Sequence, residues 1–311
     1  MILSVTLNPS IDHALFVKEL VIGDTNRVQN VETDAGGKGV NLSRVVAELG
    51  GQTVATGFLG GSTGMMVQGV LERQGVGCAF IEVAGETRTN FSVEDDAKGT
   101  PTTFNQKGPQ IELAEFQALL AKVASLANNA RWVAMGGSLP PGVPGDAFAQ
   151  IGAIATAAGC SVMIDADGEA QRLGLACRPQ FIKPNTPETA RLLGRTITTE
   201  EEAIAAARDL LGFVQADGFA VLSRGKAGAI LVSDAGVWLG RSPEVVTHST
   251  IGSGDSLIGA MLWGLETGKT LPEAFQWGLA AGAATAFTDG SEIARRPMIE
   301  ELLPRAIVTP V

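Results

Sequence analysis

Asp255 follows the short loop Gly252, Ser253 and Gly254 and opens a predicted helix with an apolar face. The unpaired backbone N–H groups and positive dipole end of a helix start favour a phosphate or a developing anion. A carboxylate in that turn repels a phosphate, so anion binding alone does not explain it. Phosphoryl transfer explains both features, because Asp255 accepts a proton from an alcohol while the amides stabilise the transferred group. A plain helix cap is the alternative.

Residues that suit a nucleotide follow two further predicted strands. Lys183, Asn185 and Glu188 come after the strand at residues 181–182. Oxygen ligands such as Asn185 and Glu188 can hold a hydrated Mg²⁺, and Lys183 can reach nucleotide phosphates. The strand at 220–222 is followed by a glycine turn that suits the underside of a nucleotide and contains Ser223, Gly225 and Gly228.

A glycine-rich run at residues 36–39, GGKG, precedes another predicted helix. It is not a Walker A motif, because Gly39 stands where Ser or Thr follows the lysine. The turn still offers backbone amides, and Asn41 can hydrogen-bond a polyol. A glycine turn with a surface lysine is the alternative. The run at 57–64, GFLGGSTG, lacks the spacing and the later acidic residue of a dinucleotide site.

Two other segments hold candidate ligands for a sugar phosphate. Arg88 lies in TRTN, and its planar fork can grip two phosphate oxygens, although a solvated surface arginine is the alternative. Ser138 lies in the run GGSLPPG, which follows a predicted strand at residues 132–135. Glycine and proline fix such a turn and let a ligand approach the backbone, whereas a purely structural turn would explain the same composition.

The order of the predicted elements favours a layered α/β fold. Apart from residues 12–33, strands and helices alternate from residue 2 to 74 and again from 113 to 222. This alternation indicates a mostly parallel sheet covered on both faces, with active groups at the carboxyl ends of the strands. Short strands in two distant segments, about 12–33 and 88–106, break the rhythm. We expect them to form one small β appendage, which suits a lid or a dimerisation sheet.

Composition and charge exclude several classes of function. The 311 residues carry a net charge of −10, which argues against a general nucleic-acid or anionic-membrane binder. Cys78, Cys160 and Cys177 are widely spaced and predicted to be reduced thiols, and His13 and His248 are the two histidines, so zinc or triad chemistry has few candidates. No signal peptide and no run of about twenty apolar residues is present, so we expect a cytoplasmic protein without a membrane span.

Six motifs stand in the order found in the phosphofructokinase B branch of the ribokinase superfamily: TLNPSID, GGKGVN, TRTN, GSLPPG, KPNTPE and TIGSGDS. Over nearly its whole length the chain resembles this branch, which includes 1-phosphofructokinase, tagatose-6-phosphate kinase and the minor 6-phosphofructokinase. The resemblance implies one kinase domain spanning residues 1–311, with a nine- or ten-stranded, mostly parallel α/β/α core. It also implies a β lid that commonly pairs between subunits, and hence a homodimer.

The resemblance also assigns roles by position. Asp255 becomes the general base, and the anion hole is formed by Gly252, Ser253 and Gly254. The sugar phosphate is held by Asp12, Gly37, Lys38, Asn41, Arg88, Asn90 and Ser138. ATP phosphates and Mg²⁺ are held by Lys183, Asn185 and Glu188. The nucleotide further contacts Ser223, Gly225, Gly228 and Thr250.

The chain departs from the branch at three positions. Gly136 replaces a common serine, Thr288 stands where the 6-phosphofructokinase type has an adenine-side asparagine, and Thr103 replaces a second phosphate-binding arginine. The surroundings TRTNFSV and FNQKGP are more similar to 1-phosphofructokinases and tagatose kinases. We therefore predict ATP- and Mg²⁺-dependent phosphorylation of fructose 1-phosphate at O6, giving fructose 1,6-bisphosphate.

The alternatives are other members of the same superfamily and a non-catalytic sensor. A kinase for tagatose 6-phosphate or fructose 6-phosphate comes next, and then a ribose or nucleoside kinase, against which TRTN and GSLPPG weigh. A sugar-phosphate sensor on this fold is expected to lose the aspartate, and Asp255 is present.

Overall fold

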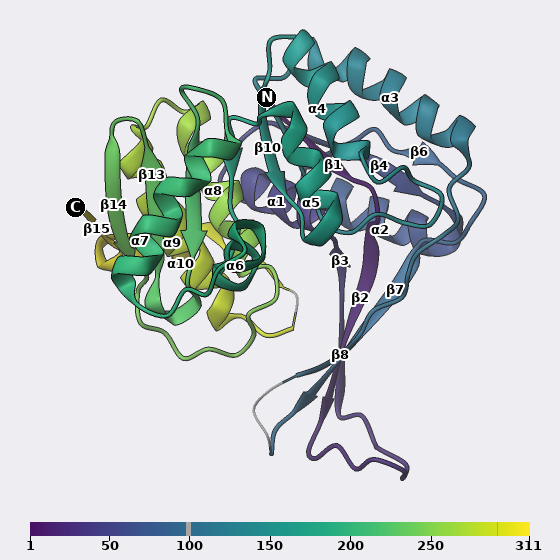
Figure 1. The fold of residues 1–311 in the computed structure, drawn as a ribbon. Coiled ribbons are helices and arrows are strands. Elements are labelled where there is room, and N and C mark those ends of the chain that lie inside the picture. Colours follow the sequence, from purple (N-terminus) through teal and green to yellow (C-terminus); the bar gives the residue numbers. More distant parts are fainter. Residues whose placement is uncertain (98–100, 291) are drawn as a thin grey trace.

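Two sheets organise the chain. The computed structural model describes residues 1–97, 101–290 and 292–311. Residues 98–100, which belong to the off-rhythm segment expected at 88–106, and residue 291 lie outside the described residues. Figure 1 shows a broad body built on the larger sheet, from which the smaller sheet projects.

Within the described residues the larger sheet has eleven strands in the order β15-β14-β13-β12-β11-β10-β9-β1-β4-β5, with β6 paired to β4. Every pairing from β12 to β5 and β6 is parallel, whereas β13, β14 and β15 are added antiparallel. The strands are β1 (Ile2–Thr6), β4 (Thr53–Leu59), β5 (Gly77–Cys78), β6 (Ile81–Glu82), β9 (Trp132–Gly136), β10 (Ser161–Asp165), β11 (Phe181–Ile182), β12 (Phe219–Ser223), β13 (Ala229–Ser233), β14 (Gly236–Arg241) and β15 (Ile307–Pro310).

Helices cover both faces of this sheet, because neighbouring strand residues point to opposite sides. Ile2 and Trp132 pack against one helical layer, while Leu3 and Val133 pack against the other. The first layer contains α1 (Lys38–Glu48), α8 (Ser253–Glu266), α9 (Leu271–Phe287) and α10 (Arg296–Leu302). The second contains α3 (Leu113–Ala127), α4 (Ala147–Ala157) and α7 (Glu200–Leu210). Shorter or peripheral helices are α2 (Gly61–Arg73), α5 (Gly168–Gly174) and α6 (Thr186–Leu193). The predicted three-layer α/β/α architecture is confirmed.

Close packing of three helices brings the first turns of α1 and α8 together. A Cβ placed on Gly259 of α8 would lie 2.9 Å from the carbonyl oxygen of Leu42 in α1. On the other side of α8, a Cβ on Gly278 of α9 would lie 2.9 Å from the carbonyl oxygen of Leu257. Real Cβ atoms do not approach that closely, so only glycine permits this spacing. Gly259 and Gly278 therefore determine the position of α8, and with it that of Asp255.

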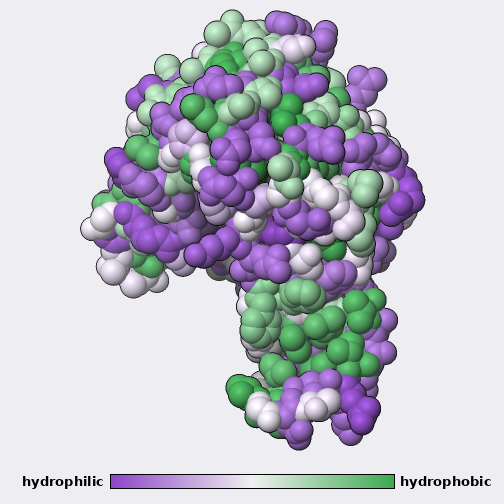
Figure 2. All heavy atoms as spheres, turned by 90° about the vertical axis from the view of Figure 1, so that its right-hand side faces the viewer, coloured by the Kyte–Doolittle hydropathy of each residue, from purple (hydrophilic) through white to green (hydrophobic). Residues whose placement is uncertain are grey.

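The smaller sheet joins two segments that are far apart in the chain. Its order is β3-β2-β7-β8, formed by β2 (Ser10–Val17), β3 (Asn30–Gly36), β7 (Arg88–Asp95) and β8 (Thr102–Phe104). Asp12 and Asn90 are paired in register and line a cavity above the larger sheet, as does Thr103. The alternating residues His13, Phe91 and Phe104 pair on the opposite face. Figure 2 shows apolar side chains gathered on this projecting part.

The antiparallel edge of the larger sheet was not expected from the sequence. The strands β13 to β15 follow one another through turns or a long connection, without the strand–helix rhythm that the sequence analysis used. The two-residue strands β5 and β6 contribute to a total of eleven in the described residues, above the nine or ten implied by the resemblance. None of the helices in the described part of the chain has the length and apolar character required to cross a membrane.

Candidate active site

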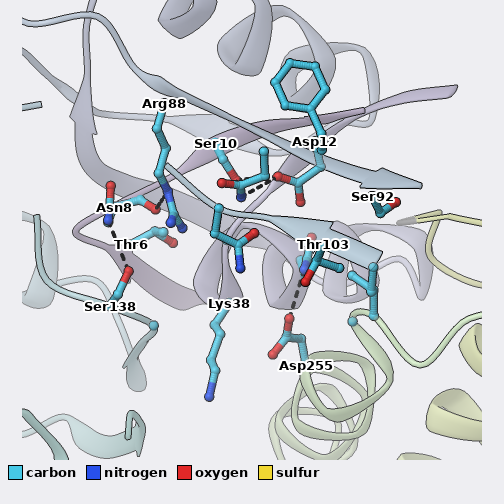
Figure 3. A pocket seen from close by; sticks show the side chains of 18 residues that line it. Thr6, Asn8, Ser10, Asp12, Lys38, Arg88, Ser92, Thr103, Ser138 and Asp255 are labelled. Carbon is cyan, nitrogen blue, oxygen red and sulfur yellow. Dashed lines mark hydrogen bonds between the residues drawn. The ribbon is translucent and has the colours of Figure 1, made fainter. Parts of the chain in front are cut away.

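A cavity of about 450 Å³ lies between the carboxyl ends of β1 and β9, the start of α8 and the polar face of the smaller sheet. In Figure 3, Arg88, Asn8 and Ser138 gather on one side of this cavity, and Asp255 lies on the other. The strand-end position agrees with the rule for parallel α/β sheets. The cavity therefore has a cationic end and a carboxylate end.

Asp255 occupies the first turn of α8 and is 8% exposed. Its Oδ2 accepts a 2.8 Å hydrogen bond from Nδ2 of Asn41 in α1, so the first turns of the two helices fix the carboxylate together. Burial, and after it the nearby Asp165 carboxylate, raise the pKa of Asp255 to about 6, against the opposing effect of Lys38. A carboxylate with this pKa is ionised at neutral pH and is a better proton acceptor than an exposed aspartate.

The helix start beside Asp255 is open to an anion. Gly252, the residue that precedes α8, has a left-handed backbone with φ of 75°, which favours glycine. A Cβ on Gly254 would lie 3.1 Å from Nζ of Lys183, so the absence of a side chain lets this buried ammonium lie beside the first turn of α8. The arrangement can stabilise a negatively charged group between α8 and Lys183.

A buried aspartate that the sequence analysis did not select joins two of the predicted lysines. Asp165 ends β10 and is 3% exposed. Its Oδ1 lies 3.2 Å from Nζ of Lys38, and its Oδ2 lies 3.7 Å from Nζ of Lys183. Burial acts to lower the pKa of Lys38, but the carboxylates of Asp165 and Asp255 raise it above its usual range. Lys38 is therefore committed to Asp165 and extends away from Arg88 (Figure 3).

The polar face of the smaller sheet presents a pre-oriented carboxylate. Oδ1 of Asp12 accepts hydrogen bonds from Oγ of Ser10 at 2.6 Å and from Nδ2 of Asn90 at 2.9 Å. Gly36 leaves room for the other carboxylate oxygen, since a Cβ there would overlap it. Because Asp12 lines the cavity and its second oxygen is free of these bonds, it can accept hydrogen bonds from sugar hydroxyl groups.

Arg88 lies at the end of the cavity opposite Asp255, and two of its N–H donors are already hydrogen-bonded. Its Nε donates to the carbonyl oxygen of Asn8 at 3.1 Å, and its Nη1 donates to that of Gln106 at 3.1 Å. These bonds hold the plane of the guanidinium and leave its remaining N–H groups for a ligand. Ser138 lines the same end, where its Oγ accepts a 3.0 Å hydrogen bond from Nδ2 of Asn8.

Several buried polar atoms around the cavity have no hydrogen-bond partner among the described residues. They are Oγ1 of Thr6, Oδ1 of Asn8 and Oδ1 of Asn41, all from residues that line it. A buried polar group without a partner is costly, so its occurrence at a cavity points to a ligand that completes the bonding. A ligand rich in hydroxyl groups fits these atoms.

Comparison with known proteins decides the family. Residues 5–296 match the family described as pfkB family carbohydrate kinases. The chain belongs to this family. A 1-phosphofructokinase of Bacillus subtilis is 32% identical over 309 residues, which cover 99% of each chain. A tagatose-6-phosphate kinase of Staphylococcus epidermidis is 32% identical over 267 residues, or 85% of each chain. The solved structure of phosphofructokinase-2 from Escherichia coli in complex with substrates and products matches with a TM-score of 0.92 at 30% identity, covering 98% of both chains.

The predicted sugar-side residues of this kinase converge on one cavity. Its lining includes Asp12, Gly37, Lys38, Asn41, Arg88, Asn90, Ser138, Gly252 and Asp255. Further lining residues were not predicted as ligands from the sequence, namely Thr6, Asn8, Ser10, Phe91, Ser92, Thr103, Asn105, Gly137 and Ile251. Asn8 and Ser10 lie inside the quoted motif TLNPSID, so the motif itself was the available signal. For Asp165, the signal was its place directly after a predicted strand.

The predicted nucleotide-side residues are not part of the lining of that cavity, and two of them lie side by side at neighbouring strand ends. Asn185 and Ser223 form a parallel bridge, which places the turns after β11 and β12 side by side. Gly225 and Gly228 have φ of 58° and 81°, and a Cβ on Gly228 would overlap the backbone of Gly240. Thr250 is exposed just before the loop that starts α8.

Thr288 stands where the 6-phosphofructokinase type has an adenine-side asparagine, and it ends α9. Its Oγ1 donates to the backbone carbonyls of Thr285 and Glu292, so its hydroxyl is used within the fold.

The two predicted metal ligands also form a helix cap. Oδ1 of Asn185 accepts from the backbone N–H of Glu188 at 2.8 Å, and Oε2 of Glu188 accepts from the backbone N–H of Asn185 at 2.7 Å. This reciprocal capping box opens α6. Oε1 of Glu188 is not used by it. Among the described residues no group of three His, Cys, Asp or Glu side chains could hold a metal by itself. One free carboxylate oxygen fits Mg²⁺ that is bound mainly by water and nucleotide phosphates.

Proposed function

We propose that this kinase acts as a single domain over residues 1–311 and transfers the γ-phosphoryl group of ATP to a ketohexose monophosphate. The substrate that we favour is fructose 1-phosphate, phosphorylated at O6 to give fructose 1,6-bisphosphate. The observation that carries this proposal is the cavity with Arg88 at one end and the buried Asp255 at the other. The relatives named 1-phosphofructokinase support it, and the relative named tagatose-6-phosphate kinase leaves tagatose 6-phosphate as the second candidate.

In the proposed reaction, Asp255 accepts the proton of the sugar hydroxyl. The hydroxyl oxygen forms a bond to the γ-phosphorus of ATP, and the bond from that phosphorus to the β-phosphate oxygen breaks, which releases ADP. The amides of residues 252–254 and the ammonium of Lys183 stabilise charge on the transferred group. Asp12 and Asn41 orient the sugar, so that the hydroxyl lies near Asp255. Beside the proposed base Asp255, the positive charge of Lys38 is balanced by the carboxylate of Asp165.

An assay of ATP consumption tests the proposed function. Fructose 1-phosphate, tagatose 6-phosphate, fructose 6-phosphate and ribose are each supplied at matched concentrations with ATP and Mg²⁺. We expect the highest kcat/KM with fructose 1-phosphate and the lowest with ribose, which lacks a phosphate for Arg88. Equal or faster turnover of ribose would contradict a site that selects a sugar phosphate.

Mg²⁺, when bound, neutralises charge on the nucleotide phosphates, and Glu188 with Asn185 would hold it through Oε1 and water. We predict that Glu188→Gln raises the Mg²⁺ concentration needed for half-maximal activity while sugar-phosphate KM stays within about twofold. The amide oxygen of glutamine still accepts the Asn185 N–H, so the cap of α6 is retained. The check is a magnesium titration of initial rates.

A matched control separates a metal role from a capping role. Glu202 closes the same kind of capping box with Thr199 at the start of α7, and Glu202→Gln is expected to leave the magnesium titration unchanged. If Glu188→Gln and Glu202→Gln both titrate like the wild type, Glu188 is a cap only.

We propose that the smaller sheet is a lid and also the contact through which two chains form a homodimer. Its outward face carries the exposed apolar side chains Val31, Phe91 and Phe104, which are 50%, 36% and 57% exposed. Exposed apolar area of this kind is typical of an interaction surface. Solved phosphofructokinase-2 from Escherichia coli includes a form described as tetrameric and inhibited.

We predict that Phe104→Lys shifts the chain from dimer to monomer at micromolar concentration, because a charge would be buried in the apolar contact. Sedimentation velocity measures the change. Met65→Lys is the control, since Met65 is 72% exposed on α2 and lies outside the smaller sheet. A Phe104→Lys protein that sediments like the wild type would show that the lid face does not hold the dimer.

A further inference from the structure

The buried side chain of Asn8 links three segments around the cationic end of the cavity. Asn8 lies between β1 and β2 and is 4% exposed. Its Nδ2 donates to the carbonyl oxygen of Lys107 at 2.9 Å and to Oγ of Ser138 at 3.0 Å. Both N–H groups of the amide are thus used, one for the turn after β8 and one for the turn after β9.

The same residue fixes the orientation of Arg88. The backbone oxygen of Asn8 accepts from Nε of Arg88, and the carbonyl of Gln106, next to Lys107, accepts from Nη1. Because the side chain of Asn8 ties down Lys107, it also holds the carbonyl that orients Arg88. Figure 3 shows Asn8 between Arg88 and Ser138. One amide therefore connects both residues that face the expected phosphate.

The packing around Asn8 leaves little room for another arrangement. Gly108 has φ of 91°, and a Cβ there would overlap Oδ1 of Asn8, so the turn lies directly on the amide. Oδ1 itself is buried and has no partner among the described residues. An amide that served only to fill space would not need both of its donors bonded to separate turns.

We infer that Asn8 is a positioning residue for the phosphate of the sugar: its amide holds Ser138 and the turn at residues 106–108, and through them Arg88, in the geometry that receives the phosphate. This inference rests on the proposed function, since it assumes a sugar-phosphate substrate. Asn8 itself is not proposed to contact the reacting atoms. Its effect is therefore expected in the binding of the phosphorylated sugar, and not in the binding of ATP.

Three substitutions test the inference. Asn8→Ala removes both donors and is expected to raise KM for fructose 1-phosphate about tenfold, with KM for ATP within about twofold. Asn8→Ser keeps one donor and should have an intermediate effect. Asn8→Asp keeps the shape, loses both donors and adds a negative charge near the phosphate, so its KM should rise further than that of Asn8→Ala. Asn128→Ala, which removes an amide at the end of α3, is the matched control.

A double-mutant cycle with Arg88→Ala separates positioning from simple destabilisation. If Asn8 acts through Arg88, Asn8→Ala should weaken sugar-phosphate binding less than about threefold in the Arg88→Ala background. Calorimetric binding of fructose 1-phosphate and the thermal midpoint are measured for every variant. The inference is overturned if the effects of the two substitutions on sugar-phosphate affinity are additive. It is also overturned if the loss of affinity across the variants merely follows the loss of thermal stability. Equal binding of fructose 1-phosphate by the wild type and by Asn8→Ala also overturns the inference about Asn8. That result leaves the proposed function standing. A wild type that binds no sugar phosphate overturns both.

Discussion

Asp255→Asn is expected to lower turnover about 10²–10⁴-fold, because the amide keeps the size of the carboxylate but cannot accept the proton of the sugar hydroxyl. Binding of both substrates should change little. The hydrogen bond from Asn41 reaches Oδ2 of Asp255, and an asparagine oxygen can still accept it. The measurement is kcat at saturating sugar phosphate and ATP, with separate binding constants for each substrate.

The control for this substitution is another aspartate at a helix start. Asp146 precedes α4 and lies outside the cavity, so Asp146→Asn should retain wild-type turnover. If Asp255→Asn keeps more than about a tenth of the wild-type kcat, the role of general base is wrong, and Asp255 is better described as a helix cap with a raised pKa.

Arg88→Ala is expected to weaken sugar-phosphate affinity about tenfold to more than a hundredfold, since hydrogen bonds to charged groups are worth roughly 1.5–3 kcal/mol. The net charge of −10 should repel a dianionic sugar phosphate, so binding has to rely on local cations. Lys38 is held by Asp165 at 3.2 Å, which leaves Arg88 as the better candidate. KM for ATP should stay nearly constant, because the predicted nucleotide-side residues are not part of the lining of the cavity that Arg88 enters.

The substrate comparison sharpens this prediction. Arg88→Ala should narrow the preference for fructose 1-phosphate over fructose, since only the first sugar carries a group for the guanidinium. Arg172→Ala removes an exposed arginine that pairs with Glu169, and it should leave both sugars unchanged. Wild-type affinity of Arg88→Ala for fructose 1-phosphate would mean that the phosphate binds elsewhere.

The motifs predicted which segments of the chain meet at the site, but not which side chains pair with one another there. Strand ends and glycine turns indicated the cavity that Asp255, Asn41 and Arg88 line. The partner of Lys38 could not be predicted, because Asp165 lies 127 positions away in sequence (165 − 38) and only the parallel pairing of β9 and β10 brings it near. Local spacing likewise does not distinguish a metal ligand from a cap, and Glu188 forms a capping box with Asn185.

Some features of the fold could likewise be predicted from the sequence, and others could not. The sequence predicted strands whose residues alternate between two buried faces, as in β9, which was expected at 132–135 and is observed at Trp132–Gly136. It did not predict β13 to β15, because an antiparallel edge joined by turns lacks the strand–helix alternation on which the interpretation depended. The two faces of the smaller sheet also follow from pairing across distant segments, which places Phe91 opposite Phe104.

The most direct test of the account is the identity of the product. Wild-type protein is incubated with ATP, Mg²⁺ and fructose 1-phosphate labelled with ¹³C at C6, and the mixture is followed by ³¹P and ¹³C NMR. We predict one new phosphorus resonance coupled to C6, which forms at the same rate as ADP and is nearly absent with Asp255→Asn. Release of inorganic phosphate without a phosphorylated C6, or equal product formation by Asp255→Asn, would contradict it.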